Sequence, residues 1–424
     1  MSEVPKGRQF PEQMRAWQHC VAFLLACLIL VTRRPDAIFH PQFCYEDGHV
    51  FFAEAYNFGW WHALLRAYDG YFHLVPRLAA SLALLAPLTS AVLVMNILAI
   101  LVQAIPVSVL LSARSSAWGS LPFRVLIAAV YLALPDNAEI TFGITWAQWP
   151  LALVAILLIV ASTPKGWIGR ACDCVLLLFA GLSGPACVLI LPIAVFLAWK
   201  RKETWRWVQC AILTACSLIQ AWSVLIFDPQ GRSASPLGIS TPILVRILGG
   251  NIFAGALLGR LRLAAMPGTG TFLFLLCAAI GGAAIMIACF LKSQVEMKLF
   301  LVFTCMLLAA SLLSPTGYPP AGTTIWQLLA GAPAMRYWFM PSLAFAWALL
   351  WCARNGNALI KSTVTILLCT MVFGIALNWK IPAFEDFHFD QYAKAFDAAP
   401  PGTVMVIPEF GPGWTIELVK HASH

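Results

Sequence analysis

Charged residues are scarce in this sequence. Only 11% of its 424 residues are Asp, Glu, Lys or Arg, whereas 60% are hydrophobic. Soluble domains carry about 25% charged residues, and one globular core cannot hide so much apolar surface from water. The composition therefore excludes a water-soluble globule. Because apolar stretches of membrane-spanning length recur along the chain, we expect an all-α polytopic membrane protein.

Motifs of several soluble enzyme classes are also absent. The chain has no Walker phosphate loop, no dinucleotide-binding glycine fingerprint and no serine elbow, so nothing supports a soluble nucleotide site. The 13 cysteines lie almost entirely in apolar segments and show no disulfide or paired-cysteine metal pattern. The net charge of +8 does not imply nucleic acid, because the basic residues form short clusters between apolar segments.

Eleven apolar segments predict membrane spans, and their cores are 17–32, 91–111, 121–134, 146–161, 172–182, 187–199, 207–226, 269–291, 299–314, 338–353 and 362–379. The first lacks a convincing signal-peptide cleavage site after it, so we expect it to be retained. The pair 172–182 and 187–199 allows two interpretations. Ser183-Gly184-Pro185 is either a turn at the outer surface or a kink in one long helix.

The distribution of charge favours two separate spans at this point. With eleven spans and a cytoplasmic N-terminus, the cytoplasmic regions hold 15 basic and five acidic residues, and the outer regions hold 12 and 14. This is the asymmetry that the positive-inside rule describes. The same rule opposes a crossing by 74–88, which we expect to be a helix in the outer interface with Pro76 in its first turn. The C-terminus is then extracytoplasmic.

These assignments divide the chain into a membrane domain, 1–379, and a short extracytoplasmic tail, 380–424. The first outer loop, 33–90, is long enough to hold one or two surface helices, and such loops are usually functional. A second outer region, 227–268, contains an amphipathic stretch with Arg246, Arg260 and Arg262. Within the tail, 402–408 predicts a short strand and 411–414 a turn.

Many of the ionisable residues expected on the outer side gather in the first outer loop, namely Glu46, Asp47, His49, Glu54, Asp69, His73 and Arg77. Asp136 and Glu139 follow in the next outer loop, and Arg336 and Tyr337 in a later one. An acid-lined outer cavity suits an enzyme that joins a polar acceptor to a phosphate-bearing lipid donor. The acid takes a proton from the acceptor hydroxyl, and an arginine holds the departing phosphate.

The acidic pair also has structural interpretations. Asp47 precedes Gly48 and a helical pattern, so it could cap a helix. This role is compatible with catalysis, because a capped carboxylate is held in place. Glu46 could pair with Arg33, Arg34 or Arg77 at the surface, with little gain in stability.

The other candidates have structural interpretations as well. Asp69 and His73 are four residues apart and would share a helix face. A metal ion could use them with one of the nearby acids, but a solvated interfacial face is the better interpretation. Arg336 could extend to the interface beside aromatic residues. The aromatic pair Trp146 and Trp149, with Gln148 between them, opens a span and suits an interfacial belt or a sugar-stacking platform.

The pattern as a whole resembles the GT-C superfamily of polyprenyl-phosphate-dependent glycosyltransferases. The matching features are Tyr45-Glu46-Asp47-Gly48, Gly70-Tyr71-Phe72-His73-Leu74-Val75-Pro76-Arg77, Asn137-Ala138-Glu139 before Trp146-Ala147-Gln148-Trp149, Leu182-Ser183-Gly184-Pro185 and Met335-Arg336-Tyr337. Many members carry a Pro-Pro-Leu segment after the acids, and this chain does not. Many also carry a large outer C-terminal domain, which the short tail here cannot form.

The resemblance implies an inverting transfer of a sugar from a polyprenyl-phosphate donor to a glycan, lipid or protein, at the outer face of a bacterial inner membrane. Asp47 becomes the catalytic base, with Glu46 orienting it or the acceptor. Arg336, and behind it Arg77, would hold the donor phosphate beside Tyr337. The residues expected around the substrates are His49, Asp69, His73, Glu139, Gln148 and Trp149. Some members need a divalent metal, and nothing in this sequence decides whether this chain does.

A glycolipid transporter or flippase is the alternative function. Transporters usually place ionisable residues near the membrane midplane and often contain repeats. Here the acids gather at one membrane face and no repeat is visible. A membrane acyltransferase would need a catalytic histidine deep in a span, and none of the eight histidines lies there. The sequence therefore favours the glycosyltransferase.

Overall fold

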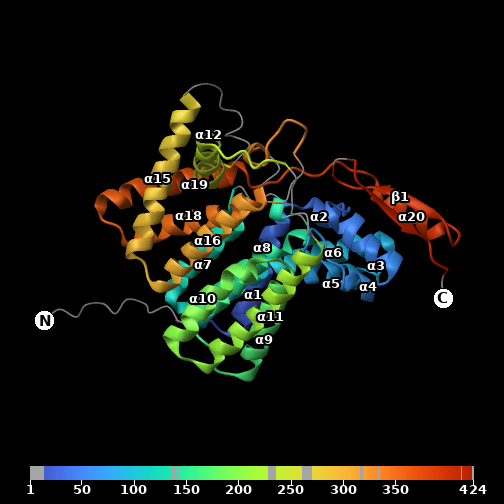
Figure 1. Ribbon diagram of the computed structural model, residues 1–424, viewed down its shortest axis with the longest axis horizontal. Helices are drawn as coiled ribbons and strands as arrows, with labels where there is room; N and C mark the ends of the chain where they lie inside the picture. Colours follow the sequence, from blue (N-terminus) through green and yellow to red (C-terminus); the bar gives the residue numbers. More distant parts are fainter. Residues whose placement is uncertain are drawn as a thin grey trace.

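The chain folds into a bundle of helices with a β-hairpin near its C-terminal end (Figure 1). The computed structural model describes residues 14–135, 137, 139–141, 143–227, 235–259, 270–315, 319–331, 335–411 and 413–422. Asp136, Arg260 and Arg262, which the sequence analysis places on the outer side, lie outside these described residues. All the other residues proposed for the site are described.

The bundle helices are α1 (Ala16–Arg33), α6 (Leu88–Leu111), α7 (Leu121–Ala133), α8 (Gln148–Val160), α9 (Trp167–Leu182), α10 (Ala186–Arg201), α11 (Thr204–Phe227), α15 (Gly270–Lys292), α16 (Val295–Leu313), α18 (Met335–Asn355) and α19 (Ala358–Leu377). The shorter elements are α2 (Asp36–Phe39), η1 (Asp47–Phe52), α3 (Ala53–Phe58), α4 (Trp60–Leu64), α5 (Leu74–Ala83), η2 (Ala113–Trp118), η3 (Glu139–Thr141), η4 (Ile144–Ala147), α12 (Thr241–Val245), η5 (Arg246–Ala254), α13 (Gly255–Leu258), α17 (Ile325–Ala330), α20 (Phe389–Ala398), β1 (Val404–Pro408) and β2 (Thr415–Val419).

Seven helices within the described residues are long and apolar enough to cross a membrane: α1, α6, α11, the continuous stretch Thr241–Leu258, α15, α16 and α19. All but Thr241–Leu258 coincide with predicted spans. This confirms the expectation of a helical protein of membrane type, since a helix satisfies its own backbone hydrogen bonds in lipid. The other predicted spans are helical too, but α7 to α10 have only 13 to 16 residues each. The count of eleven therefore stays a prediction.

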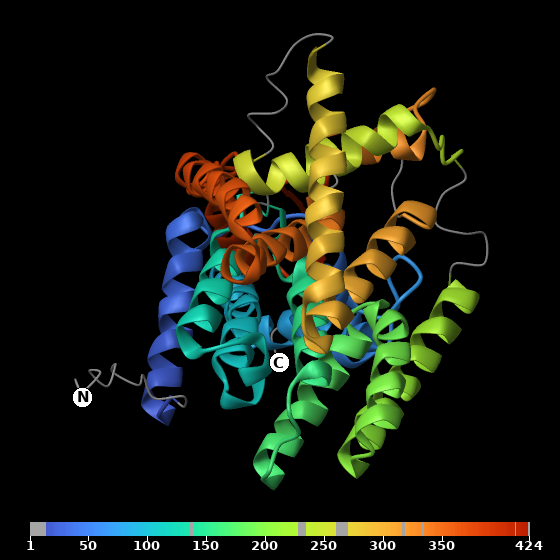
Figure 2. The ribbon, with the colours of Figure 1, turned by 90° about the vertical axis from the view of Figure 1, so that its left-hand side faces the viewer.

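The stretch Thr241–Leu258 differs from the sequence-based expectation. The sequence predicted an amphipathic outer stretch with Arg246, Arg260 and Arg262, and its described part is an apolar helix of 18 residues; its outer placement stays a prediction. This helix crosses α15 near one end rather than running beside it (Figure 2). A Cβ on Gly249 would lie 1.9 Å from the backbone oxygen of Leu275. Glycine therefore permits direct backbone contact at the crossing.

Helices α9 and α10 run in opposite directions along α8. Asp173, near the start of α9, binds Arg114, whose Nε also donates to a carbonyl just beyond the end of α8. Arg201, at the end of α10, donates to carbonyls at the same end of α8. Gly184, between the two helices, lies against Gln148 at the opposite end of α8. The segment between α9 and α10 is therefore a reversal and not a kink in one helix.

The first outer loop contains more helix than the sequence indicated. It holds α2, η1, α3, α4 and α5 between α1 and α6. Helix α5 has 10 residues and contains Pro76 in its first turn. At 1.5 Å per residue it is about 15 Å long, half the thickness of the hydrocarbon layer. Its length agrees with the predicted interfacial helix, and its place relative to the membrane stays a prediction.

The tail packs against this loop. The predicted strand is present as β1, which pairs antiparallel with β2. The hairpin and α20 lie beside the helices of the first outer loop (Figure 1). At the root of the tail, the backbone N–H of Ile381 donates to the carbonyl of Arg33 at the end of α1. Segments from the two ends of the sequence therefore form one layer.

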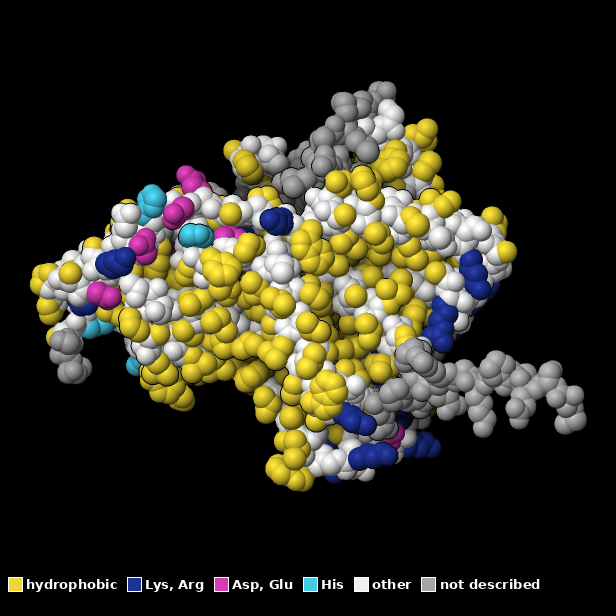
Figure 3. Space-filling view, turned by 180° about the vertical axis from the view of Figure 1, so that it is seen from behind, with side chains coloured by type: hydrophobic (Ala, Val, Ile, Leu, Met, Phe, Trp, Pro, Cys, Tyr) yellow, Lys and Arg dark blue, Asp and Glu magenta, His cyan; other side chains and the backbone are white. Residues whose placement is uncertain are grey.

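Charge is distributed unequally over the molecule. On the face shown in Figure 3, acidic and histidine side chains gather at the end that carries the C-terminal hairpin, and clusters of lysines and arginines lie toward the other end, with a broad hydrophobic band between them. Exposed acids of the tail include Asp386 and Asp390, and exposed basic residues of the opposite end include Lys165, Arg170 and Lys202. This polarity is the pattern that the positive-inside rule describes.

Candidate functional site

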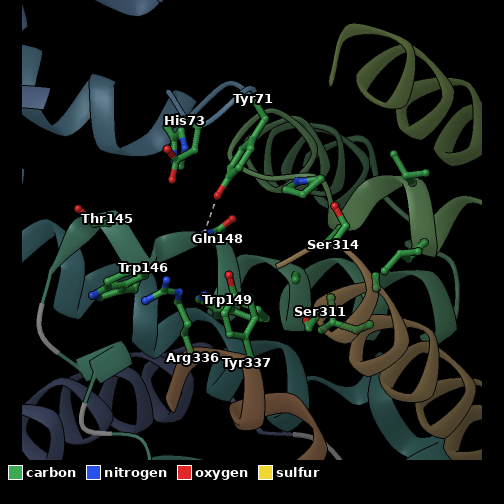
Figure 4. A pocket seen from close by; sticks show the side chains of 18 of the residues that line it. Tyr71, His73, Thr145, Trp146, Gln148, Trp149, Ser311, Ser314, Arg336 and Tyr337 are labelled. Carbon is green, nitrogen blue, oxygen red and sulfur yellow. Dashed lines mark hydrogen bonds between the residues drawn. The ribbon is translucent and has the colours of Figure 1, made fainter. Parts of the chain in front are cut away.

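A cavity of about 270 Å³ lies at the end of the bundle that carries the C-terminal hairpin. Its polar and aromatic lining comes from the first outer loop, from η4 and the starts of α8 and α18, and from the end of α16: Glu46, Asp69, Tyr71, His73, Thr145, Trp146, Gln148, Trp149, Ser311, Ser314, Arg336 and Tyr337 (Figure 4). Its apolar lining includes Ala152, Ala186, Val188, Leu189, Leu307 and Ala310 from α8, α10 and α16. Seven of the eleven residues proposed from the sequence therefore line one cavity.

Glu46 is the acid of the predicted pair that lines this cavity. Its Oε2 is buried and has no hydrogen-bond partner among the described residues. Burial raises the pKa of Glu46 to about 7, because a charged carboxylate loses its hydration, and Asp69 adds to this while Arg336 and His49 oppose it. The suggested surface partners bind elsewhere: Arg33 donates to backbone carbonyls, Arg34 binds Asp36, and Arg77 binds Glu54.

Asp47 faces away from the cavity. Its side chain is 2% exposed, and its two carboxylate oxygens accept hydrogen bonds from the backbone N–H groups of Ile144 at 3.0 Å and Thr145 at 2.8 Å. The Thr145 hydroxyl also donates to it. A Cβ on Gly143 would lie 2.6 Å from Asp47 Oδ2. Asp47 therefore clamps the start of η4, which leads directly into α8.

The proposed capping role of Asp47 needs correction. It does not cap the helix that it begins, η1, because its carboxylate bonds to backbone groups almost 100 residues later. Asp47 does accept backbone N–H donors, as an acid at a helix start can. The helix whose start it binds is η4 and not η1. Burial raises the pKa of Asp47 to about 7, although the donors from Thr145 and Ile144 oppose the shift.

Arg336 lies at the start of α18 and forms one wall of the cavity. Its guanidinium donates to Glu139 Oε1 at 2.6 Å, and its backbone N–H donates to Glu139 Oε2 at 2.7 Å. The guanidinium carbon also lies 4.8 Å from the ring centre of Trp146. In Figure 4, Arg336 extends between Trp146 and Trp149. Glu139 thus holds a cavity arginine in place and does not line the cavity itself.

Arg77 does not line the cavity. Its guanidinium is fully buried, donates to Glu54 Oε2 at 2.7 Å and lies 5.3 Å from the ring centre of Phe51. This pair holds α5 against η1 and α3. We therefore no longer assign the donor phosphate to Arg77, because its guanidinium lies outside the cavity lining, where it binds Glu54.

Asp69 and His73 line the cavity but do not share a helix face. Asp69 lies in a tight turn with a positive φ of 50°, between the bridged residues Tyr68 and Tyr71. His73 precedes α5 and packs against the Tyr71 ring, with ring centres 4.4 Å apart. The four-residue spacing was therefore misleading, because a turn and not a helix joins the two residues. Tyr71 also accepts a hydrogen bond from Gln148 at 3.4 Å (Figure 4).

His49 lies behind the cavity wall, where it meets a residue that the sequence analysis did not select. Glu409, just after β1, is 2% exposed and accepts hydrogen bonds from the backbone N–H groups of Gly48 and His49 and from His49 Nδ1. Burial lowers the pKa of His49, but its bond to Glu409 more than offsets this and raises the value. A lone acid directly after an apolar strand was the only signal for Glu409.

No three His, Cys, Asp or Glu side chains converge as a metal site among the described residues. The described residues therefore do not decide whether the protein needs a metal ion, and neither does the sequence.

A scan of protein-family models gives no match to this chain, and no curated protein matches its sequence.

Proposed function

We propose that this chain is an integral-membrane, GT-C-like glycosyltransferase that moves a sugar from a polyprenyl-phosphate donor to a hydroxyl acceptor with inversion. The observation that carries the proposal is a single cavity that combines three features. These are a carboxyl oxygen of Glu46 with no protein partner, the guanidinium of Arg336, and an apolar half between α10 and α16. A base, a phosphate holder and a lipid-compatible wall are what this reaction needs.

Glu46 takes the role of general base in place of Asp47. A base works best when its pKa lies near the working pH, and burial brings the pKa of Glu46 to about 7. In the reaction, Glu46 accepts the proton of the acceptor hydroxyl as the acceptor oxygen bonds to the anomeric carbon. The bond from that carbon to the phosphate oxygen breaks at the same time. The proton later leaves Glu46 for water.

Arg336 stabilises the leaving group. The phosphate gains negative charge as its bond to the sugar breaks, and a guanidinium already fixed by Glu139 and Trp146 meets this charge without reorganising. The aromatic side chains of Trp146, Trp149 and Tyr337 suit stacking against a sugar ring. Small residues on α10 and α16 leave room for the first part of a lipid chain.

A glycolipid transporter remains the alternative function. The ionisable residues of the cavity lie at one end of the bundle, level with the start of α8 and the end of α16. Transporter sites usually lie near the midplane. The placement therefore supports the enzyme, and detergent solution separates the two functions, because transport needs two compartments and transfer does not.

The test is sugar transfer by the purified full-length protein in detergent, with a panel of labelled polyprenyl-phosphate sugars and water-soluble or lipid acceptors. We expect Glu46→Gln to lower the turnover number at least 100-fold, since a positioned base contributes roughly 10²–10⁴. Arg336→Lys should lower it less, because one cation remains.

The matched control is Glu417→Gln, which alters an exposed acid of the tail. It should retain wild-type transfer. Full activity in Glu46→Gln together with loss of activity in Asp47→Asn would restore Asp47 as the base. Absence of transfer with every donor, combined with lipid movement in sealed vesicles, would favour the transporter.

A further inference from the structure

The C-terminal hairpin makes a buried, three-donor contact with the turn that carries Glu46. Glu409 Oε1 accepts from the backbone N–H of Gly48 at 2.9 Å. Its Oε2 accepts from the backbone N–H of His49 at 3.0 Å and from His49 Nδ1 at 2.9 Å. Backbone donors at a helix start favour a carboxylate. Three donors on a carboxylate with 2% exposure make this a specific contact rather than a surface ion pair.

The backbone beside Glu46 needs such support. Tyr45 has a φ of 53°, in the left-handed region that residues with a Cβ seldom adopt. Its N–H donates to the Phe410 carbonyl at 3.1 Å, and its ring packs edge-on against Phe410 and Trp414. The residue before Glu46 and the two residues after Asp47 are therefore all held by Glu409, Phe410 and Trp414.

Glycine at position 48 is part of the same contact. A Cβ there would lie 2.5 Å from Glu409 Oε1 and 2.5 Å from Ile416 Cδ1. Real Cβ atoms do not approach other atoms so closely, so only glycine lets the tail seat at this depth. The chain thus has two independent sites, Gly48 and Glu409, at which the same contact can be broken.

The contact also fixes which way the two acids point. Asp47 is bound to the start of η4 and Glu46 lines the cavity, although they are neighbours in the chain. The charged groups around Glu46 are Arg336, Asp69 and His49. Of these, His49 is the one that Glu409 holds. A change at position 409 therefore reaches Glu46 through the backbone of η1 and through His49.

The structure assigns Glu409 as a positioning residue: we propose that the C-terminal hairpin, through Glu409, holds the start of η1 so that Glu46 projects into the cavity. Glu409 does not line the cavity and acts on substrate only through Glu46. The inference rests on the proposed function only in naming Glu46 as the base. The contact itself can be tested without any sugar substrate.

The first readout is chemical labelling of Glu46. A hydrophobic carbodiimide attacks protonated carboxyl groups in apolar sites, and mass spectrometry of peptides locates the adduct. In the full-length wild-type protein in detergent, we expect Glu46 to be labelled with a pH midpoint near neutrality and Asp47 to be protected by its three donors. Glu46→Gln should remove the adduct.

The variants Glu409→Gln and Gly48→Ala should each shift the midpoint of Glu46 labelling or change its rate several-fold. Glu417→Gln is the matched control on the same hairpin and should match the wild type. Thermal unfolding in detergent identifies any variant that has lost its fold, and two variants with different chemistry guard against this. Wild-type labelling in both Glu409→Gln and Gly48→Ala would overturn the proposal.

The second readout is transfer, where transfer is found. Glu409→Gln should lower the turnover number with little change in KM and should move the pH profile, and Glu409→Asp should recover part of the loss. A purely structural role would lower the amount of folded protein without moving the profile. If the wild type transfers no sugar but Glu409→Gln alters the labelling, the positioning role stands and the proposed function fails. If transfer needs Glu46 while Glu409→Gln changes neither the labelling nor the transfer, the proposed function stands and the positioning role of Glu409 fails.

Discussion

Glu46, Asp47 and Glu409 are three carboxyl groups packed around one turn of the chain, and their donors distinguish them. Asp47 and Glu409 each receive three hydrogen bonds, whereas Glu46 Oε2 receives none among the described residues. A carboxylate bound by several donors is held in its place, whereas a buried carboxyl oxygen without a donor keeps unused hydrogen-bonding capacity beside the cavity. The arrangement therefore separates two acids held by donors from Glu46, the acid that we propose as the base.

The sequence identified the acidic pair and Arg336 because such residues are rare in this chain. It could not show which acid faces the cavity. That depends on the left-handed turn at Tyr45, on a donor to Asp47 that lies 98 positions away, and on an acceptor for Gly48 that lies 361 positions away. Glu409 was missed for the same reason, since nothing local to it signals a partner so distant in sequence.

The transfer rate should depend on pH through Glu46. Burial raises its pKa to about 7, and a base works only when deprotonated, so kcat/KM should rise with pH and level off above about 7. Below that point the rate should fall about tenfold per pH unit. Initial rates between about pH 5 and pH 9 measure this. A profile that already levels off near pH 4.5, the ordinary range of Glu, would contradict it.

The stability of the fold should decrease as pH rises, whereas the transfer rate should increase. Burial raises the pKa values of Glu46 and Asp47 to about 7, from 4.5 and 3.8 in water. Groups whose pKa is raised by folding bind protons more tightly in the folded state, so their contribution is complete below about pH 4 and is lost as pH rises through about 7. The unfolding temperature in detergent should therefore fall between about pH 4 and pH 7. Glu46→Gln should reduce that fall, and an unchanged slope would count against the shift.

Gly143→Ala should loosen the clamp made by Asp47. The new Cβ would lie 2.6 Å from Asp47 Oδ2, so either the carboxylate or the start of η4 must move. Overpacking of this kind costs roughly 1–3 kcal/mol, and we expect a lower unfolding temperature and slower transfer. Gly166→Ala is the control, because a Cβ there meets nothing within 4 Å. Equal effects at both positions would contradict the close approach between Gly143 and the Asp47 carboxylate.

At the scale of elements, the apolar segments predicted where helices form, and the distribution of charge predicted that the chain reverses direction between α9 and α10. Each predicted span is a helix in the structure, and α9 and α10 reverse as the charge count required. The stretch Thr241–Leu258 is longer and more apolar than the arginine-containing outer segment that the sequence predicted, and its outer location stays a prediction. Its path across α15 depends on tertiary contact at Gly249, which no local pattern encodes.

Gly249→Ala should separate the α12–α13 stretch from α15. A Cβ at this position would lie 1.9 Å from the Leu275 backbone oxygen, and backbone cannot move aside as a side chain can. We expect the unfolding temperature to fall by several degrees, in line with roughly 1–3 kcal/mol of overpacking. Gly281→Ala on α15 is the control, since its Cβ would meet nothing within 4 Å. A neutral Gly249→Ala would mean that the two helices pack more loosely than described.

At the scale of the whole molecule, one end carries the cavity, the first outer loop and the acidic tail, and clusters of lysines and arginines lie toward the other end. The positive-inside rule then predicts that the cavity faces away from the cytoplasm. The positions of the charged residues along the sequence were enough to predict this polarity. They were not enough for the contact between the tail and the first loop, which needs the fold.

Reporter fusions test the orientation. Alkaline phosphatase fused after residue 420 should be active, because it folds only outside the cytoplasm, and green fluorescent protein at the same site should be dark. In the loop at Lys202, between α10 and α11, the two reporters should give the opposite result. The same result at both positions would require a different number of crossings between them.

The contact between Glu409 and Gly48 also has a consequence for the order of synthesis. The two residues are 361 positions apart, so at about 5–20 residues per second the ribosome makes Gly48 roughly 20–70 seconds before Glu409. In the predicted orientation, the loop bearing Glu46 would be exported during that interval without its clamp. The contact is therefore made last, and nascent chains that have not reached the hairpin do not yet possess it.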